Sequence, residues 1–168
     1  HGCKHSGSDT MPFTLVGGGA VLDGSAPVPA EAWENYRGPV FRFRAPHSEY
    51  QQLFLGGRPA PQVPASRLAD LPPKLAPLQW CLHNGYVYFC VEKLKLPESY
   101  ALSYTSQRVG ISLLYVQHVV IQDLVIQGYQ LDAVNAFNSA RLVALVGLTC
   151  RGNGRSGITV GGASLVGV

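Results

Sequence analysis

Five polar residues in the last third of the chain have side chains suited to chemistry on sugars. They are one carboxylate, three amides and one guanidinium: Asp132, Asn135, Asn138, Asn153 and Arg155. A carboxylate is the usual acid, base or nucleophile at a glycosidic bond, and an arginine can clamp a substrate carboxylate with two hydrogen bonds. We therefore take Asp132 as the candidate catalytic residue and the other four as candidate substrate-binding residues.

The same residues also have a purely structural interpretation. Asp132 and Asn138 could satisfy turn backbone, as these residue types often do, and Arg155 could pair with Asp132 as a surface ion pair. Cleavage by two carboxylates needs a second acid about 5–9.5 Å away. Asp123 is the other acid in this part of the chain, and we expect it at a corner away from Asp132. His118 is likewise expected to be a structural turn residue.

The elements that would position these residues come from a repeat of 23 or 24 residues. Within it, apolar residues two positions apart recur in three series. The first series is Ile111 and Leu113, Val134 and Ala136, Ile158 and Val160. The second is Val119 and Ile121, Leu142 and Ala144, Val166 and Val168; the third is Leu124 and Ile126, Leu148 and Cys150.

This alternation predicts short β-strands, because residues two apart share one face of a strand. The many glycines between them would weaken helices. Strands one period apart must run parallel, and stacking them buries a shared apolar interior. We expect the "RGNGRSG" segment to be a turn in which Asn153 and Gly154 supply positive φ. A strand at Val166–Val168 would leave the apolar stack exposed beyond it, so we predict that the stacked strands continue in a longer protein.

From Val109 to Val168 the sequence resembles the right-handed parallel β-helix family, which includes pectate lyases, polygalacturonases, epimerases and several glycosidases. "GAVLDG" resembles the opening rungs of such enzymes, so residues 1–37 are expected to form early rungs and residues 106–168 later ones. The resemblance implies a carbohydrate-active protein that cleaves or binds a polysaccharide, as a glycoside hydrolase or lyase. The alternative is a non-catalytic solenoid that binds a glycan or a protein.

Residues 38–105 interrupt the period and are expected to form an inserted antiparallel β subdomain. "NG" at Asn84 and Gly85 is a preferred hairpin turn, so Trp80 should face Phe89, and Cys81 should face Tyr88 rather than Cys90. The segments "QQLFLGGRP", Trp80 and "NGYVYFCVEKLKLPESY" resemble an insertion found in several β-helix glycosidase-like proteins. The loop "VPASRLADLPP" departs from that pattern, so a substrate role for Arg67 is not carried over.

Composition narrows the function classes further. The 168 residues are 46% hydrophobic and 14% charged, with a net charge of +3 and scattered Lys and Arg. This balance does not indicate a nucleic-acid or membrane-surface partner, and no apolar run reaches the roughly 20 residues of a membrane span. The expected partner is a polysaccharide or oligosaccharide, and the expected location is extracellular or periplasmic.

The four cysteines do not have the spacing of a metal site. His1, Cys3 and His5 could hold a metal only adventitiously, and we expect neither a metal nor another cofactor. "LVGGGAVLDG" lacks the Lys-Ser/Thr of a phosphate loop and the third glycine of a dinucleotide fingerprint, so nucleotide binding is not expected.

Overall fold

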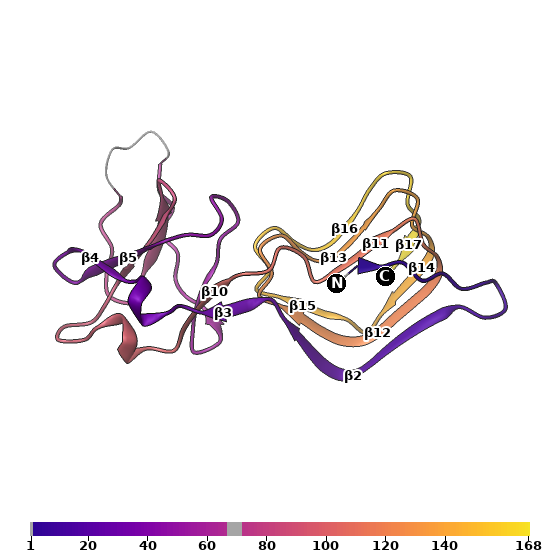
Figure 1. Cartoon of the computed structure of the whole chain (residues 1–168), viewed down its shortest axis with the longest axis horizontal. Coiled ribbons are helices and arrows are strands. Elements are labelled where there is room, and N and C mark those ends of the chain that lie inside the picture. Colours follow the sequence, from indigo (N-terminus) through magenta and orange to yellow (C-terminus); the bar gives the residue numbers. More distant parts are fainter. Residues whose placement is uncertain (1, 67–71) are drawn as a thin grey trace. The chain divides into compact units, whose positions relative to one another are not determined.

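The computed structural model describes residues 2–66 and 72–168, and the chain is all-β, as predicted. Its described helices are two single turns of 3-10 helix, η1 (Ala30–Ala32) and η2 (Pro97–Ser99). The chain forms two compact units (Figure 1). Unit 1 contains residues 1–25 and 107–168, and unit 2 contains residues 26–106.

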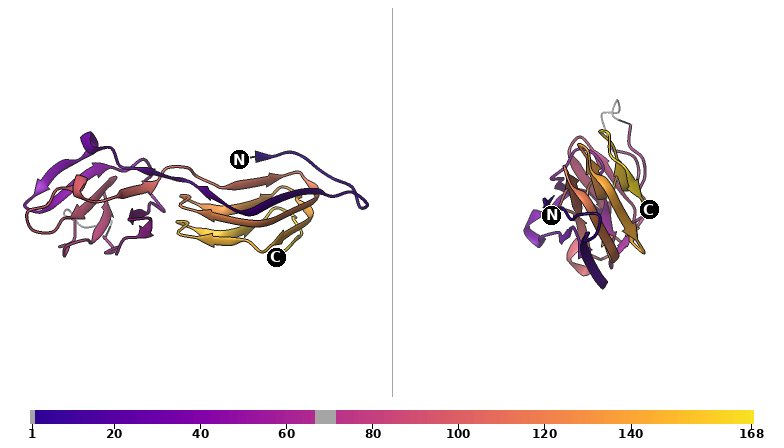
Figure 2. Two further views of the ribbon diagram at one scale, coloured as in Figure 1. Left: turned by 90° about the horizontal axis from the view of Figure 1, so that it is seen from below. Right: turned by 90° about the vertical axis from the view of Figure 1, so that its right-hand side faces the viewer.

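Unit 1 is built from parallel strands that lie one above another (Figure 2). One sheet has the order β1-β11-β13-β16, and in the other β12 pairs with β2, β14 and β15, while β17 pairs with β14. The bounds are β1 Gly2–Cys3, β2 Phe13–Asp23, β11 Ile111–Leu114, β12 Gln117–Gln127, β13 Asp132–Phe137, β14 Arg141–Val146, β15 Thr149–Arg151, β16 Ser156–Val160 and β17 Val166–Gly167.

The pairing register confirms two of the three predicted series. Ile111 pairs with Val134, and Val134 pairs with Ile158. Ile126 pairs with Cys150. Phe13 and Leu22 of β2 lie beside β12, so "FTLV" and "AVLD" form one more parallel strand layer next to it.

The middle series is wrong by one residue. Val119 pairs with Val143 rather than Leu142, and Ile121 pairs with Leu145 rather than Ala144. The extra residue lies in the turn before β14: Leu114 pairs with Phe137 and Gln117 pairs with Arg141, so residues 138–140 follow β13 where only residues 115–116 follow β11. Asn138 and Ser139 of this longer turn both have positive φ, and the inward side chains of β14 therefore fall one position later than a constant spacing of 23 predicts.

A corner divides β12 into two straight halves. Asp123 is exposed with a φ of 57°, and the pairing with β2 shifts between Gln122 and Leu124. The prediction that Asp123 is a corner residue is therefore confirmed. On β2 the equivalent bend contains Gly18 and Gly19, both at positive φ, where a side chain would be strained.

The interior of unit 1 is apolar. Its buried cluster comes from residues 111–145 and includes Leu113, Ile121, Ile126, Val134 and Leu145, and partly buried apolar residues of β2, β15, β16 and β17 pack against it. These side chains alternate with outward-facing ones along each strand, as they must when one face of a strand is buried. Chemistry in this unit must therefore come from outward positions and from turns.

Unit 2 consists of two antiparallel sheets. Their orders are β4-β5-β9-β8 and β3-β10-β6-β7. The strands span β3 Ser25–Pro27, β4 Glu34–Arg37, β5 Val40–Arg44, β6 Leu53–Leu55, β7 Arg58–Pro59, β8 Trp80–His83, β9 Tyr86–Cys90 and β10 Leu102–Thr105. The interruption thus begins at Ala26 rather than at residue 38, because Trp33 packs edge-on against Phe43 at 4.9 Å.

The β8–β9 hairpin has the predicted register. Trp80 faces Phe89 and Cys81 faces Tyr88, and Asn84 and Gly85 have φ values of 46° and 77°, as a type I′ turn requires. One face of the hairpin contributes Trp80, Val87 and Phe89 to the main core of unit 2. The other face places Cys81, Tyr88 and Cys90 in a second, smaller cluster.

Both hairpin cysteines are free thiols, and burial raises the pKa of Cys81 to about 11. Only the thiolate reacts. We therefore expect iodoacetamide at about pH 8 to label Cys81 at least about a hundredfold more slowly in the native protein than in urea. Mass spectrometry after timed quenching measures both rates. Equal rates would mean that the hairpin opens readily.

Candidate functional site

The predicted catalytic residue is the most enclosed carboxylate of unit 1. Asp132 begins β13, and its side chain is 0% exposed. It lies beside Ser156 of β16, so the turn before β16 passes directly next to it. That turn carries Arg155, which follows Asp132 by 23 residues, the period of the repeat.

Arg155 and Asn135 both direct their side chains at Asp132. The guanidinium donates from Nε to Oδ1 at 2.9 Å and from Nη2 to Oδ2 at 2.5 Å. Asn135 Nδ2 donates to Oδ2 at 3.3 Å. The predicted convergence of these three residues across two layers is thus present, with the bidentate geometry that arginine favours.

This arrangement makes the Asp132 carboxylate inaccessible to a substrate. Both oxygens of Asp132 are engaged, whereas the Arg155 side chain is 37% exposed and covers the pair from outside. A general acid or nucleophile must reach the substrate atom to within hydrogen-bond distance. Asp132 can do so only after Arg155 moves. We call this group of Asp132, Asn135 and Arg155, which joins β13 to the turn before β16, the inter-strand lock.

The other two predicted binding residues lie apart from this lock. Asn153 Oδ1 accepts from Tyr129 N at 3.1 Å, and its Nδ2 donates to Ile126 O at 3.2 Å. The positive φ predicted for Asn153 and Gly154 is found instead at Gly152, so Asn153 bridges backbone with its side chain. Asn138 follows the far end of β13 and is exposed with a φ of 53°.

An outward ladder that the sequence analysis did not identify crosses three strands of unit 1. Gln127 pairs with Asp23 on one side and with Arg151 on the other. Gln127 Nε2 donates to Asp23 Oδ2 at 2.7 Å, and Arg151 Nε donates to Gln127 Oε1 at 2.7 Å. We call these three residues the polar ladder. Its two charged ends are exposed.

Hydrogen bonds keep the Asp23 carboxyl group of the polar ladder ionised. Burial acts to raise the pKa of the Asp23 carboxyl, but hydrogen bonds from Gln127 and from Ser25 N, with the nearby charge of Arg151, lower it overall. Asp23 is therefore ionised at neutral pH. The ladder presents a carboxylate, an amide and a guanidinium in fixed order, one strand spacing of about 4.8 Å apart.

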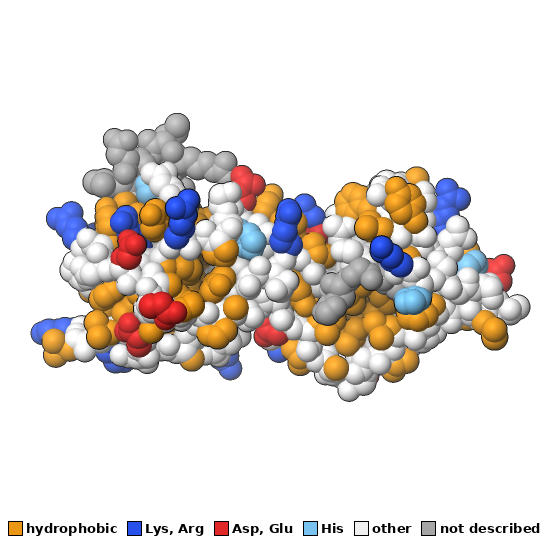
Figure 3. Space-filling view, in the orientation of Figure 1, with side chains coloured by type: hydrophobic (Ala, Val, Ile, Leu, Met, Phe, Trp, Pro, Cys, Tyr) orange, Lys and Arg blue, Asp and Glu red, His pale blue; other side chains and the backbone are white. Residues whose placement is uncertain are grey.

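An apolar row runs beside the polar ladder. Val125 pairs with Val21 and with Thr149, two residues before each ladder position. Val21 is 53% exposed. The outer face of this part of the sheet thus offers a row of hydrogen-bonding groups next to a row of methyl groups. On the face drawn in Figure 3, the charged side chains are scattered rather than gathered in one patch.

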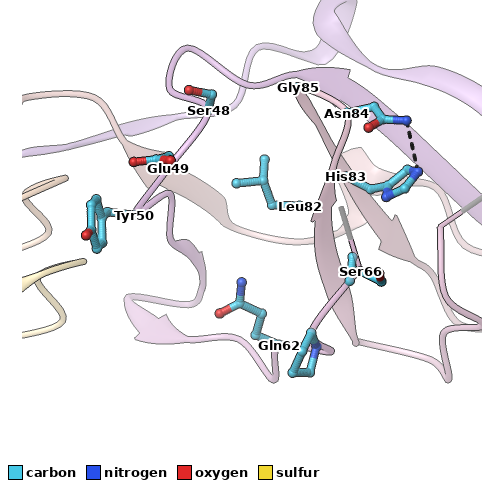
Figure 4. A pocket seen from close by; sticks show the side chains of 11 residues that line it. Ser48, Glu49, Tyr50, Gln62, Ser66, Leu82, His83, Asn84 and Gly85 are labelled. Atoms are coloured by element: carbon cyan, nitrogen blue, oxygen red, sulfur yellow. Dashed lines mark hydrogen bonds between the residues drawn. The ribbon is translucent and has the colours of Figure 1, made fainter. Parts of the chain in front are cut away.

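Unit 2 contains a separate pocket of about 620 Å³ (Figure 4). Its walls are the segment Ser48–Tyr50, the segment around Gln62, and the end of the β8–β9 hairpin. Leu82 and Gln62 point into the space between these walls. Asn84 Nδ2 lies 3.1 Å from His83 Nε2; because the amide donates, this ring nitrogen accepts.

Comparison with known proteins gave no matching family model, no matching curated protein and no matching solved structure.

The remaining predictions concern Arg67, the N-terminal His and Cys residues, and the absence of a membrane span. Arg67, His1 and the side chain of Cys3 lie outside the described residues, and His5 stacks on Phe13 with ring centroids 5.2 Å apart. In the described part of the chain, no three His, Cys, Asp or Glu residues are grouped as metal ligands, and no helix is long and apolar enough to cross a bilayer.

Proposed function

We propose that the chain is part of a glycan-binding protein of the right-handed parallel β-helix type. The β-helix assignment is supported by parallel strands that pair at the repeat spacing, with a corner at Asp123. A polysaccharide is the expected ligand, and an extracellular or periplasmic location follows from where such ligands occur. Any cleavage of the polysaccharide by the whole protein belongs to this proposal as well.

The polar ladder with its apolar row is the observation that carries the proposal. A sugar ring has hydroxyl groups at its edge and C–H groups on its faces, so it matches a hydrogen-bonding row beside a methyl row. The ladder residues are already held by one another, so they lose little side-chain freedom when a ligand binds. A protein partner would instead favour aromatic anchors at this surface.

Binding is favoured over cleavage because of Asp132. Its carboxylate is buried and held by Arg155 and Asn135, whereas the ladder's carboxylate, Asp23, is exposed. The described residues thus provide an accessible set of binding groups, and the catalytic assignment of Asp132 requires the lock to open.

Removing the central ladder residue should weaken glycan binding about tenfold. Gln127→Ala deletes the amide that orders Asp23 and Arg151, which corresponds to about 1–1.5 kcal/mol of hydrogen bonding. Titration of the ¹⁵N-labelled chain with neutral and acidic oligosaccharides, followed by amide chemical shifts, gives the affinity and the location. Shifts should appear along β2, β12 and β15.

Gln122→Ala is the matched control. Gln122 is an outward glutamine of the same strand with the same partial burial, but its neighbours across the strands are Val16 and Val146. It should bind as the wild type does. Equal weakening in both variants, or an absence of shifts on this face with every oligosaccharide, would contradict the proposal.

A further inference from the structure

We propose that the polar ladder selects acidic glycans, with Arg151 as the residue that binds the carboxylate of a uronic acid. The inference rests on the proposed function, because it names the class of sugar that the same surface takes. Arg151 lies at one end of the ladder, on β15, and Asp23 lies at the other end, on β2. An acidic group of a ligand is therefore attracted to one end and repelled by the other.

The hydrogen bond to Gln127 fixes the Arg151 guanidinium and leaves its terminal fork available. Arg151 Nε donates to Gln127 Oε1 at 2.7 Å. Within residues 2–66 and 72–168 its terminal nitrogens, Nη1 and Nη2, make no hydrogen bond, and the residue is exposed. A carboxylate can accept from both terminal nitrogens at once, in the planar pairing that arginine favours. Because the guanidinium is already held, little side-chain freedom is lost when a ligand binds.

The Asp23 carboxylate does not neutralise this site. Asp23 lies two strands from Arg151, which is about 10 Å at the strand spacing of a sheet. That distance exceeds the Debye length of about 8 Å at physiological ionic strength, so the two exposed charges interact weakly. The charge of Arg151 is accordingly the smallest of the causes that shift the pKa of Asp23. Arg151 therefore remains a positive site for a ligand at β15.

The opposite charges give the bound glycan a direction. A uronate carboxylate over β15 places hydroxyl groups of the glycan toward Gln127 and Asp23. The Asp23 carboxylate has lone pairs left to accept from a hydroxyl, whereas its charge repels a second carboxylate at β2. Arg155, which the sequence suggested as a binding residue for a substrate carboxylate, donates to Asp132 instead. Arg151 is thus the specificity-determining residue of this surface.

Two tetrasaccharides that differ only at C6 test the selection: cellotetraose and the matching tetramer of β-1,4-linked glucuronic acid. Each is titrated into the ¹⁵N-labelled chain, and the amide shifts give the affinity and the location. The acidic tetramer should bind about tenfold more tightly than cellotetraose. Its largest shifts should fall on Thr149–Arg151. Raising the salt concentration should reduce the preference, because the charges that cause it are exposed.

Arg151→Gln should remove the preference, so that the two tetramers bind with similar affinity. Arg151→Lys keeps the positive charge but loses the fork, and it should retain only part of the preference. Arg141→Gln is the matched control, because Arg141 is also an exposed arginine and lies on β14 of the same sheet. This variant loses the same formal charge and should bind both tetramers as the wild type does.

The outcomes separate this inference from the proposed function. Equal affinities for the two tetramers, with shifts on β2, β12 and β15, would overturn the selection of acidic glycans and leave glycan binding standing. An equal loss of preference in Arg141→Gln would show a general charge effect and overturn the role of Arg151. Tighter binding of cellotetraose 6-sulfate than of the glucuronate tetramer would overturn the assignment to carboxylates. An absence of shifts on this face with every oligosaccharide would instead contradict the proposed function.

Discussion

Replacing Asp132 with asparagine should lower the free energy of unfolding of unit 1 by about 3–5 kcal/mol. The carboxylate is fully buried and accepts from Arg155 at both oxygens and from Asn135. Asp132→Asn places an amide that can donate against a guanidinium that only donates, and it removes the negative charge to which Arg155 donates two hydrogen bonds. Hydrogen exchange of the β13 and β16 amides under increasing denaturant measures the loss.

Two further variants test whether the loss of stability comes from the buried ion pair. Glu34→Gln breaks the exposed Glu34–Arg42 pair, whose side chains are 59% and 31% exposed, and it should cost less than about 1 kcal/mol. Combining Asp132→Asn with Arg155→Met should recover part of the stability, because no uncompensated charge remains. A loss below about 1 kcal/mol from Asp132→Asn alone would favour the catalytic assignment over the lock.

Trp80→Ala should destabilise unit 2 by about 3–5 kcal/mol. Trp80 is 0% exposed at the centre of the core that Phe43, Leu53 and Phe89 complete. Its indole Nε1 also donates to Ala60 O at 3.0 Å, so the truncation leaves a cavity and removes a buried carbonyl's donor. Loss of amide protection along β5, β8 and β9 is the expected observation.

The protection of unit 1 separates a local effect from a general one. The core of unit 1 shares no residue with that of unit 2, so β12 and β13 should keep their exchange rates in the Trp80→Ala protein. Trp80→Phe keeps much of the apolar volume but not the hydrogen bond, and it should cost about 1–3 kcal/mol. Parallel loss of protection in both units would show that they unfold together.

Local patterns in the sequence predicted the strands well, because alternation and turn chemistry act over few residues. The hairpin at Asn84 and Gly85 has the expected register, and the pairing of Ile111 with Val134 follows from spacing alone. The register of β14 could not be obtained this way. The turn before β14 is one residue longer than the turn before β12, and the apolar pattern alone does not show in which turn the extra residue of a 24-residue period lies.

The candidate site was harder to predict, since its chemistry depends on burial. The spacing brought Asp132 and Arg155 together correctly, but the sequence does not show that the guanidinium lies over the carboxylate and closes it. The polar ladder had a usable signal: Gln127 and Arg151 are separated by the repeat spacing. Asp23 was missed because the intervening domain hides its position in the repeat.

The point at which unit 2 joins unit 1 determines how far one unit can change without the other. Gln107 N donates to Gly24 O at 2.9 Å, so the chain leaves unit 1 and rejoins it at adjacent backbone groups. Unit 2 thus takes the place of a turn between two neighbouring backbone groups of unit 1, and its length does not change how the strands of unit 1 pair. A change in the length of unit 2, or its loss, would therefore leave the strand pairs of unit 1 intact.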